Sequence, residues 1–517
     1  MKSIKFLFFI LLLSLLVASE NKSNYITRLK TLTEVIRLVS EHYVDEPDMN
    51  EVLEGAIIGM LEKLDPHSTY LTSDLLTQMQ ENFQGEFEGI GIEFSIIDGY
   101  ITVISPIPDT PSDRAGLMSG DKIIKIDDES AYKITQEDVF DKLRGPKNSK
   151  VNLTIRRANV EDFDVTLFRD KIPIHSVLAS FMIDDETGYI KINRFSHTTF
   201  SEFNESLNKL ESEGMKQLLL DLRNNPGGLM NQAVDMVDMF INSKDTIVFT
   251  KGRIRGVSRS ERATRSYKDK KYPIVTLINR GSASASEIVS GAFQDLDRGI
   301  IVGETSFGKG SVQNLLQLHD GSAVKLTVAK YYTPSGRSIH RSHDSGIDEY
   351  YLDLARDNRE DIQTDSTNNK PIFYTKSGRE VYGGGGITPD IYVDSDLNLS
   401  KSSSEFLIHP DRLLFNFSNQ IKNELDDKFE NIDDFIENYY LSGSHKSDLK
   451  IILQDLDDSF SNEDFDSDWN YLENRIKAQV ANALWGKSAM YKVHLNMDQI
   501  ALEGMKQFKL AKDLLIK

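Results

Sequence analysis

Apolar residues recur at every third or fourth position near the start of the chain. Between residues 24 and 44 these positions are Ile26, Leu29, Leu32, Val35, Ile36 and Val39. This spacing places them on one face of a helix. A second periodic segment, 49–71, meets Asp65-Pro66, where we expect its helix to end. Residues 20–84 are therefore predicted to form a helical N-terminal region.

From about residue 85 to residue 170 the pattern changes to short strands separated by glycine turns. Segments 85–107 and 115–128 have the alternation of three strands, and segment 135–157 reads as a helix followed by a closing strand. The size and order of these elements predict a β-rich domain over 85–170.

After residue 186 strands alternate with helices. Predicted strands are 188–192, 217–222, 246–250, 273–279 and 300–303, and predicted helices are 201–212, 229–241 and 282–296. Such alternation is typical of βαβ units in a largely parallel sheet covered by helices. A hairpin, 311–332, follows. We assign 171–394 to this α/β core.

Two further segments differ from the core in composition. Residues 342–371 are polar and poor in large apolar side chains, so we expect an exposed insertion. Residues 395–517 are helical in pattern and acidic, and the acidic run 455–469 is more typical of a solvated face than of a binding site. The amphipathic stretch 411–425 suits either an interface or an ordinary helical core.

Bulk composition narrows the classes of function. A chain of 517 residues is too long for one hydrophobic core and predicts two to four domains. A formal charge of -20 argues against a broad nucleic-acid surface. The absence of cysteine excludes disulfides, thiol catalysis, cysteine-ligated zinc and lipid attachment through an N-terminal cysteine.

The N-terminus resembles a secretory signal. Lys2 and Lys5 precede an apolar run from Phe6 to Ala18, which is shorter than the about 20 residues of a membrane-spanning helix. The small residues Val17 and Ser19 permit cleavage after Ser19. We predict a signal peptide over 1–19 and export to the periplasm or cell envelope of a bacterium. The alternative is an uncleaved anchor.

A serine-rich stretch, 279–293, holds the first candidate chemistry. It contains Ser282, Ser284, Ser286 and Ser290, and no histidine lies near them. A predicted strand leads through Gly281 into a helix start, whose free N–H groups and dipole favour an oxyanion. The alternative is a tight turn that uses small residues for steric reasons.

Lys309, between Gly308 and Gly310, is a candidate base. It opens a predicted strand, and period 2 places Lys309, Ser311 and Gln313 on one face, so that Gln313 can orient the amine. A neutral lysine can deprotonate a serine nucleophile. Its ordinary pKa of about 10.4 must then fall by about three units, at a cost near 4 kcal/mol, which only a closed site imposes. The alternative is a solvated turn residue.

A third loop follows the predicted strand that ends at Asp221-Leu222. In this loop Gly227 and Gly228 can present amides to an oxyanion. Read alone, it is more typical of an ordinary strand-to-helix loop. All three loops, however, lie at strand ends of one α/β sheet, where active sites collect.

With these three loops, the sequence resembles a known family, the C-terminal processing peptidases or tail-specific proteases. The resemblance covers about 30–394 and includes, in order, GMLEKLDPHSTYL, GIGI, AGLMSGDKI, LRGPKNSKV, LDLRNNPGG, NRGSASASEI, GETSFGKGSVQ, KYYTPSGRSI and GGGGITPDI. It implies an α/β multidomain protein with a PDZ domain at 85–170 and a crotonase-like serine protease core at 171–394.

The resemblance also implies roles for single residues. The nucleophile maps to Ser284, the general base to Lys309 and its supporting glutamine to Gln313. The oxyanion donors map to the amides of Ala285 and of Gly227 or Gly228. Ser282 and Ser286 become framework residues, and no cofactor or metal is implied.

The PDZ resemblance assigns peptide binding to Gly89, Ile90, Gly91 and Ile92. Amides of such a loop capture a terminal carboxylate, and the adjoining strand edge accepts the peptide as a further strand. The helix 137–143 forms the other wall of the groove. Arg144, which ends this helix, is either a sensor of occupancy or a surface charge. The alternative for the whole domain is a purely rigidifying role.

Two hypotheses follow. The first is a secreted serine endopeptidase that recognises the C-terminal tails of protein substrates and cleaves them through a Ser/Lys dyad and an acyl-enzyme. The second is a non-catalytic PDZ scaffold on a degenerate protease core. Residues 395–517 are left as a homo-oligomer interface, an adaptor site or a lid.

Overall fold

The computed structural model describes residues 24–158, 160–242, 244–264, 270–344, 346–352, 370–394, 398–425 and 428–516. The predicted signal segment and most of the polar insertion lie outside these ranges. The chain divides into two units, and each is described by itself. One unit comprises Met1–Thr72 and Leu315–Leu326, and the other comprises Ser73–Asn314 and Thr327–Lys517.

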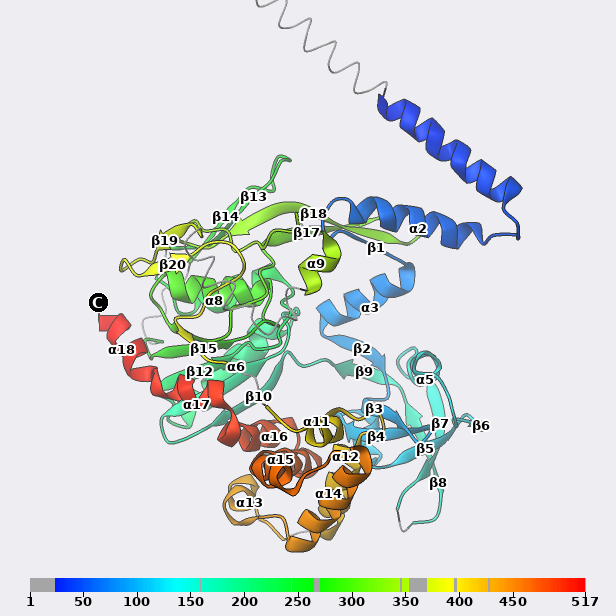
Figure 1. The fold of residues 1–517 in the computed structure, drawn as a ribbon, viewed down its shortest axis with the longest axis vertical. Helices are drawn as coiled ribbons and strands as arrows, with labels where there is room; N and C mark the ends of the chain where they lie inside the picture. The colour runs from blue at the N-terminus through cyan, green and yellow to red at the C-terminus, as the bar shows by residue number, and fades with distance from the viewer. Residues whose placement is uncertain are drawn as a thin grey trace, which may run out of the picture. The chain divides into compact units, whose positions relative to one another are not determined.

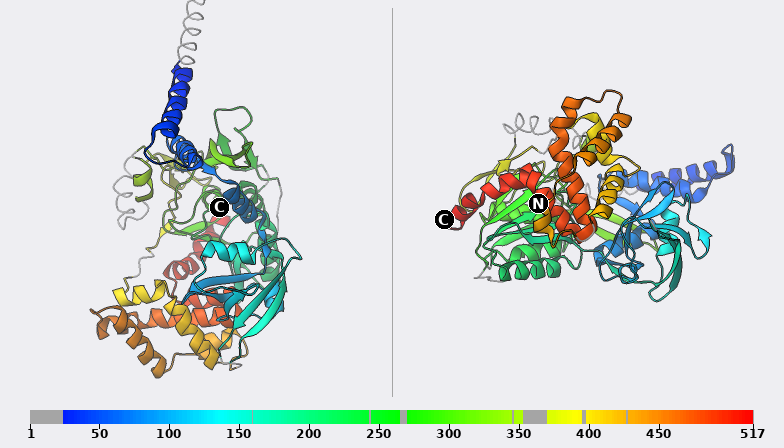
Figure 2. Two further views of the ribbon diagram at one scale, coloured as in Figure 1. Left: turned by 90° about the vertical axis from the view of Figure 1, so that its right-hand side faces the viewer. Right: turned by 90° about the horizontal axis from the view of Figure 1, so that it is seen from below.

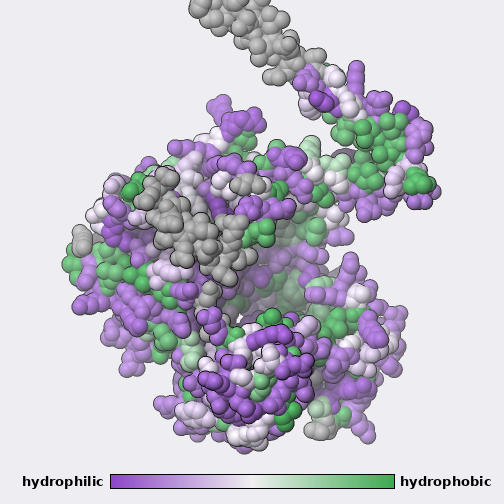
Figure 3. Space-filling view, viewed as in Figure 1, coloured by the Kyte–Doolittle hydropathy of each residue, from purple (hydrophilic) through white to green (hydrophobic). Residues whose placement is uncertain are grey.

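The first unit is built from helices with little core of their own. Residues 24–42 are helical, and α2 (Met49–Glu62) follows, capped by the Asp48 side chain, which accepts from the N–H groups of Asn50 and Glu51. β1 (Thr69–Leu71) pairs antiparallel with the first residues of β18 (Ala323–Tyr332). Among residues 24–64, all of which are described, Leu61 alone is buried. Apolar side chains therefore gather on the surface of these helices (Figure 3).

In the second unit, α3 (Ser73–Gln84) leads into the β-rich domain. The elements of this domain are β2 (Glu86–Gly89), β3 (Ile92–Ile97), β4 (Tyr100–Pro106), α4 (Pro111–Arg114), β5 (Lys122–Ile126), β6 (Glu129–Ser130), α5 (Gln136–Leu143), β7 (Lys150–Arg156), β8 (Phe163–Phe168) and β9 (Asp170–Pro173). Its antiparallel sheet has the order β3-β4-β5-β7-β8, so β3 is an edge strand. Ile101, Val139 and Val151 lie in a core closed by α5.

The α/β core contains a six-stranded sheet in the order β10-β11-β12-β15-β16-β21. Its elements are β10 (Val177–Met182), β11 (Thr187–Ile192), α6 (Thr199–Ser212), β12 (Gln217–Asp221), α7 (Met230–Asp238), β15 (Ile274–Ile278), α8 (Ala285–Asp295), β16 (Ile300–Gly303) and β21 (Ile391–Tyr392). β10 is antiparallel to β11, and the other pairs are parallel. The predicted α/β multidomain organisation is confirmed.

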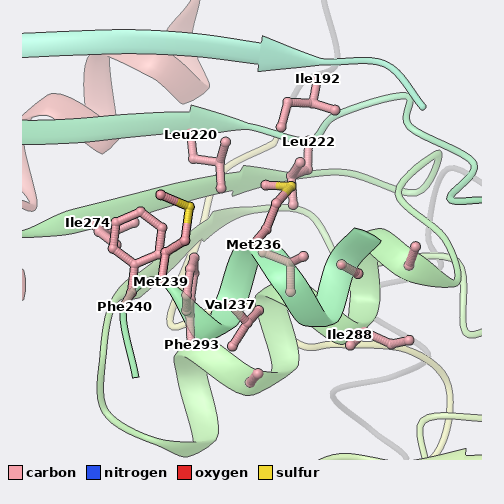
Figure 4. Packing of buried hydrophobic residues seen from close by; sticks show 14 of the residues in the cluster. Ile192, Leu220, Leu222, Met236, Val237, Met239, Phe240, Ile274, Ile288 and Phe293 are labelled. Carbon is pink, nitrogen blue, oxygen red and sulfur yellow. The ribbon is translucent and has the colours of Figure 1, made fainter. Parts of the chain in front are cut away.

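Helices cover both faces of this sheet because successive strand residues point to opposite sides. Leu218 and Leu220 pack with residues of α6, α7 and α8 on one face. The close-up shows Leu220 facing the helices that carry Met236 and Phe293 (Figure 4). Leu219 points to the other face and packs with residues of α17 (Gln499–Lys506) and α18 (Phe508–Ile516). These two helices lie against the sheet (Figure 1, Figure 2). The C-terminal end of the chain thus completes the core.

One predicted strand belongs to another sheet. Segment 246–250, expected in the parallel series, forms β13 (Thr246–Lys251), which pairs antiparallel with β14 (Ser260–Arg262) and with the end of β18. A short apolar run predicts a strand but not its partner. The predicted hairpin 311–332 is observed as β17 (Ser311–Gln317) and β18.

The remaining elements lie between β18 and β21 or after β21. They are α9 (Ile347–Leu352), β19 (Ile372–Tyr374), β20 (Glu380–Tyr382), α11 (Lys401–Ile408), α12 (Leu413–Glu424), α13 (Ile432–Asn438), α14 (Gly443–Leu456), α15 (Asn462–Trp485), α16 (Lys487–His494) and η3 (Leu495–Met497). Helices α11–α16 share an apolar core of their own. Phe417 and Ile421 of the amphipathic stretch 411–425 are buried in it. No helix of the described ranges is long and apolar enough to cross a membrane.

Candidate functional site

Three of the four serines in 279–293 use their hydroxyls to hold the backbone. Ser282 Oγ donates to the carbonyl of Leu222 at 2.9 Å, Ser286 Oγ to that of Asn225 at 3.0 Å, and Ser290 Oγ to that of Ser286 at 2.9 Å. All three serines are buried. Ser284 is partly exposed, and within the described part of the chain its hydroxyl makes no such donation. Ser284 is therefore the serine available for chemistry.

The backbone of Ser284 is held in an unusual conformation. It precedes α8 with φ 54° and ψ -110°, a region that costs a non-glycine residue on the order of 1–3 kcal/mol. Its N–H donates to Glu287 Oε2 at 2.7 Å, and its carbonyl accepts from Tyr331 Oη at 3.0 Å. These two partners fix the direction in which the Ser284 side chain leaves the loop.

Glu287 also holds the loop that carries Lys309. Its carboxylate accepts from the N–H of Gly308 at 2.7 Å, from the N–H of Lys309 at 2.9 Å and from Ser306 Oγ at 2.6 Å. Burial raises the pKa of this carboxyl, and the hydrogen bonds from Ser306 and the backbone N–H groups oppose that shift. One carboxylate thus ties the backbone of Ser284 to that of Lys309.

Sequence reasoning did not select Glu287. The spacing Ser284-x-x-Glu287 is nevertheless a recognised signature of a helix N-terminus, in which the glutamate side chain reaches back to the first residue. Tyr331, which comes from a distant strand, has no comparable local signal.

The glycines beside Lys309 are required by close backbone approach. A Cβ on Gly310 would lie 2.9 Å from the backbone nitrogen of His340, and one on Gly308 would lie 3.1 Å from that of Gly386. Tyr331 N–H donates to the Gly310 carbonyl at 2.9 Å. Tyr331 therefore contacts both the serine loop and the lysine loop.

Gln313 lies on the same strand face as Ser311, as the period of two predicts. Its amide nitrogen donates to Ser311 Oγ at 2.8 Å and to Thr327 Oγ1 at 3.3 Å. These two contacts fix the orientation of the Gln313 side chain next to the lysine loop.

The Gly227-Gly228 turn lies against the serine loop. A Cβ on Gly227 would be 2.7 Å from Ser284 Cβ and 2.8 Å from the nitrogen of Ala285, and its φ is 91°. The Gly227 N–H donates to Asn225 Oδ1 at 2.9 Å. For the Gly228 N–H, the described residues offer no hydrogen-bond acceptor. Of the two amides, that of Gly228 is the one left for a ligand.

The predicted tail-binding loop joins β2 to β3. Gly89 ends β2, and Ile92 begins the edge strand β3. Gly91 has φ 84° and packs against Thr110, whose hydroxyl donates to the Gly91 carbonyl at 3.1 Å. Ile90 is buried, and its carbonyl accepts from Ser112 Oγ at 2.7 Å. The loop conformation is therefore fixed without a ligand.

Aromatic side chains lie between β3 and α5. The rings of Phe94 on β3 and Phe140 on α5 lie 5.6 Å apart. At the end of α5, the Arg144 guanidinium lies 4.7 Å from the Phe87 ring and 4.8 Å from the Phe140 ring, and it pairs with Glu81 at 2.7 Å. Arg144 thus links the groove helix to α3 and is not a free surface charge.

The site offers no evident metal ligands. Across the described ranges there is no group of three or more histidine, aspartate or glutamate side chains placed to hold a metal ion.

Comparison with protein families gives three matches. Residues 186–349 match Peptidase family S41, residues 102–157 match the PDZ domain, and residues 14–75 match the Activating protease CtpB N-terminal domain.

Curated relatives agree with these matches. The chain is 40% identical over 329 residues to the Carboxy-terminal-processing protease of Bartonella bacilliformis, an alignment that covers 62% of this chain and 75% of that protein. It is 35% identical over 353 residues to the Carboxy-terminal processing protease CtpA of Bacillus subtilis, with 65% and 75% covered. Among solved structures, a photosystem II D1 C-terminal processing protease is 26% identical and covers 70% of this chain and 92% of its own, with a TM-score of 0.36.

Proposed function

The chain belongs to peptidase family S41, the family of the carboxy-terminal processing proteases, and from this premise we propose that it is an exported endopeptidase with a Ser284/Lys309 dyad. It is a serine-type peptidase and carries a PDZ domain. Its proposed substrates are proteins whose C-terminal tails occupy the groove between β3 and α5.

The proposed reaction has two steps. The uncharged Lys309 amine takes the proton of Ser284 Oγ as the oxygen attacks the scissile carbonyl carbon. The peptide C–N bond then breaks, the leaving amine takes that proton, and the acyl part remains as an ester on Ser284. In the second step, water loses a proton to Lys309 and attacks the ester, which releases the acid and returns the proton to Ser284. Gln313 orients the amine.

The observation that carries this proposal is the shared carboxylate of Glu287, which accepts from the N–H groups of Ser284 and Lys309. The other three serines of the stretch 279–293 donate their hydroxyls to backbone carbonyls, and among the described residues Ser284 makes no such donation. The developing oxyanion is assigned to the amides of Ala285 and Gly228, because the amide of Gly227 already donates to Asn225.

Tail recognition is assigned to Gly89, Ile90, Gly91 and Ile92. The terminal carboxylate is bound by amides of this loop, and the preceding residues of the tail add as a strand to the edge of β3. Phe94 and Phe140 favour an apolar side chain near the end of the tail.

The proposed location is the periplasm or cell envelope. It is supported by the apolar run 6–18 behind two lysines and by the bacterial source of the relatives. Mass spectrometry of the protein from a periplasmic fraction is expected to find Glu20 as its first residue. An intact N-terminus in that fraction would instead support an anchor.

A second copy of the chain is the proposed partner of the N-terminal helices. Helix 24–42 leaves a continuous apolar face uncovered, and a helix with such a face gains stability by burying it. Its exposed members are Leu29, Leu32 and Val35, which lie beside the partly buried Ile36 and Val39. Light scattering is expected to give a dimer or larger assembly, which Leu32→Glu with Val35→Glu reduces to a monomer. Lys30→Glu, on the opposite face by helical spacing, keeps the assembly. A monomeric parent chain would point to an adaptor instead.

The test of the enzymatic proposal compares matched variants on an unfolded substrate with an apolar C-terminus. Ser284→Ala and Lys309→Ala are each expected to abolish cleavage while the circular dichroism spectrum stays unchanged. Ser201→Ala and Lys209→Ala, at exposed positions of α6, are expected to retain it. Normal turnover by either dyad variant refutes the assignment. Binding of the tail without cleavage by the parent chain would support the scaffold hypothesis.

A further inference from the structure

A cavity of about 400 Å³ lies at the carboxyl ends of β11, β12 and β15. Lys191 and Asp221 line it from the sheet, and Arg475, His494 and Asp498 line it from the C-terminal helices α15–α17. The volume is that of a small-molecule site, and this edge is where open α/β sheets bind ligands. All these residues belong to the second unit.

Four of the charged residues in its wall neutralise one another. Asp221 accepts from Lys191 Nζ at 2.9 Å and from Arg223 Nη2 at 2.6 Å, and it also accepts from the hydroxyl of Tyr189. Arg223 donates in addition to both carboxylate oxygens of Asp498, at 2.7 Å and 2.6 Å. The wall contains no further carboxylate.

Arg475 is the cation that remains. No carboxylate of the described residues lies within ion-pair distance of it, and its Nε is buried without a hydrogen-bond acceptor. Its Nη1 faces the His494 ring, 3.3 Å from Nε2. Burial, and then the charge of Arg475, lower the pKa of His494 to about 3, so the ring is neutral at neutral pH. The cavity therefore carries one uncompensated positive charge.

We propose that this cavity is a binding site for a small oxyanion, a carboxylate or a phosphate, held by Arg475. A guanidinium presents parallel N–H groups that match two oxygens of such an anion. Tyr471, Asn474 and Tyr491 line the same space and provide neutral polar groups around it. A bound cation is disfavoured by the net charge of the wall.

The cavity adjoins two loops of the proposed active site, so an anion bound in it can influence catalysis. This part of the inference rests on the proposed function. Asn224 and Asn279 line the cavity and bond to each other, with Asn279 Nδ2 donating to Asn224 Oδ1 at 2.9 Å and Asn224 N–H donating to Asn279 Oδ1 at 2.8 Å. Asn224 begins the loop that reaches Gly228, and Asn279 begins the loop that reaches Ser284. An anion bound beside this pair changes the positions of both loops.

Binding is tested by calorimetry on the full chain carrying Ser284→Ala, so that the result does not depend on proteolysis. Inorganic phosphate and succinate are titrated separately at one ionic strength, with chloride as the reference. We expect saturable binding of one anion per chain, and the tighter arm identifies the chemistry. Arg475→Gln is expected to weaken binding at least tenfold, about 1.4 kcal/mol. Arg412→Gln, an exposed arginine of the C-terminal region, is expected to bind like the parent.

Two results overturn the site. One is that neither anion saturates the protein up to about 10 mM, since a dissociation constant above that value means a binding free energy weaker than about 3 kcal/mol. The other is equal binding by Arg475→Gln. If Arg475→Gln does not fold, Arg475→Lys makes the comparison, because it keeps the charge and loses the parallel donors. Binding by Arg475→Lys as tight as by the parent also overturns the proposal. The effect of the anion on catalysis is tested in the active chain. An anion that binds without changing kcat refutes the link to the active site but not the binding site itself.

Discussion

A residue with positive φ that is not glycine needs partners to keep it there, and Ser284 has two. Glu287 accepts its N–H, and Tyr331 donates to its carbonyl. Burial, together with the charge of Glu287, raises the pKa of Tyr331 well above its usual value. The Tyr331 hydroxyl therefore keeps its proton, and remains a hydrogen-bond donor, over the whole pH range in which a protease works.

Removal of that hydroxyl is expected to slow catalysis without unfolding the protein. Tyr331→Phe leaves the Ser284 carbonyl without its partner and is expected to cost about 1 kcal/mol of stability. We expect kcat to fall and KM to change little, measured on a peptide with an apolar C-terminus. Tyr332→Phe is the matched control, since its ring stacks on Phe249. Equal kcat for both variants would contradict a positioning role for Tyr331.

A change at Glu287 is expected to affect both stability and rate. Glu287→Gln replaces one acceptor oxygen by a donor facing buried N–H groups, and each buried donor left unsatisfied costs about 1–3 kcal/mol. Denaturant unfolding and peptide cleavage measure the two effects. Glu205→Gln, at an exposed position of α6, should match the parent in both. Full activity of Glu287→Gln would show that the carboxylate is dispensable.

At the scale of elements, the end of β12 carries a buried ion cluster. Burial raises the pKa of Asp221, but the charges of Arg223 and Lys191 outweigh it and hold that pKa well below its usual range. A carboxyl with a depressed folded-state pKa stabilises the protein above its unfolded-state value, about 3.9. This contribution is lost as the pH falls from there through the folded-state pKa.

Asp221→Asn is therefore expected to cost most at neutral pH. Loss of one partner from a buried cluster costs about 3–5 kcal/mol, and the difference from the parent should shrink below about pH 4. Urea unfolding at a series of pH values measures it. The exposed Asp141→Asn serves as the reference. A difference that stays constant down to pH 2, in about the range where the cluster should titrate, would contradict this account.

Local patterns predicted most elements but not their long-range partners. The strands and helices around Ser284 and Lys309 follow from periodicity and turn residues, and the motifs select both residues. The assignment of 246–250 to the parallel sheet is wrong, because a short apolar run does not specify which strand it pairs with. The contacts from Tyr331 to Ser284 and from Asp498 to Arg223 join distant segments. No spacing within either segment encodes them.

At the scale of the whole molecule, the C-terminal region is part of the protease core. Helices α17 and α18 cover the face of the sheet that contains Leu219, Val275 and Leu277. Sequence analysis left residues 395–517 as an interface, an adaptor site or a lid. The part from Gln499 onward instead packs on this face of the sheet and shields its apolar side chains from solvent.

This role predicts a large difference between two residues of one helix. Phe508 is 6% exposed and Leu510 is 42% exposed. Phe508→Ala is expected to lower the free energy of unfolding by about 3–5 kcal/mol, and Leu510→Ala by less than about 0.5 kcal/mol. Thermal or urea unfolding makes the comparison. Equal, small losses would mean that α18 is a detachable extension.

The carboxylate shared by Ser284 and Lys309 makes two loops depend on one residue. One substitution at position 287 removes the acceptor of both backbone N–H groups, so it disturbs the serine loop and the lysine loop together. Cleavage is therefore expected to depend on residue 287 even in a chain that keeps both Ser284 and Lys309.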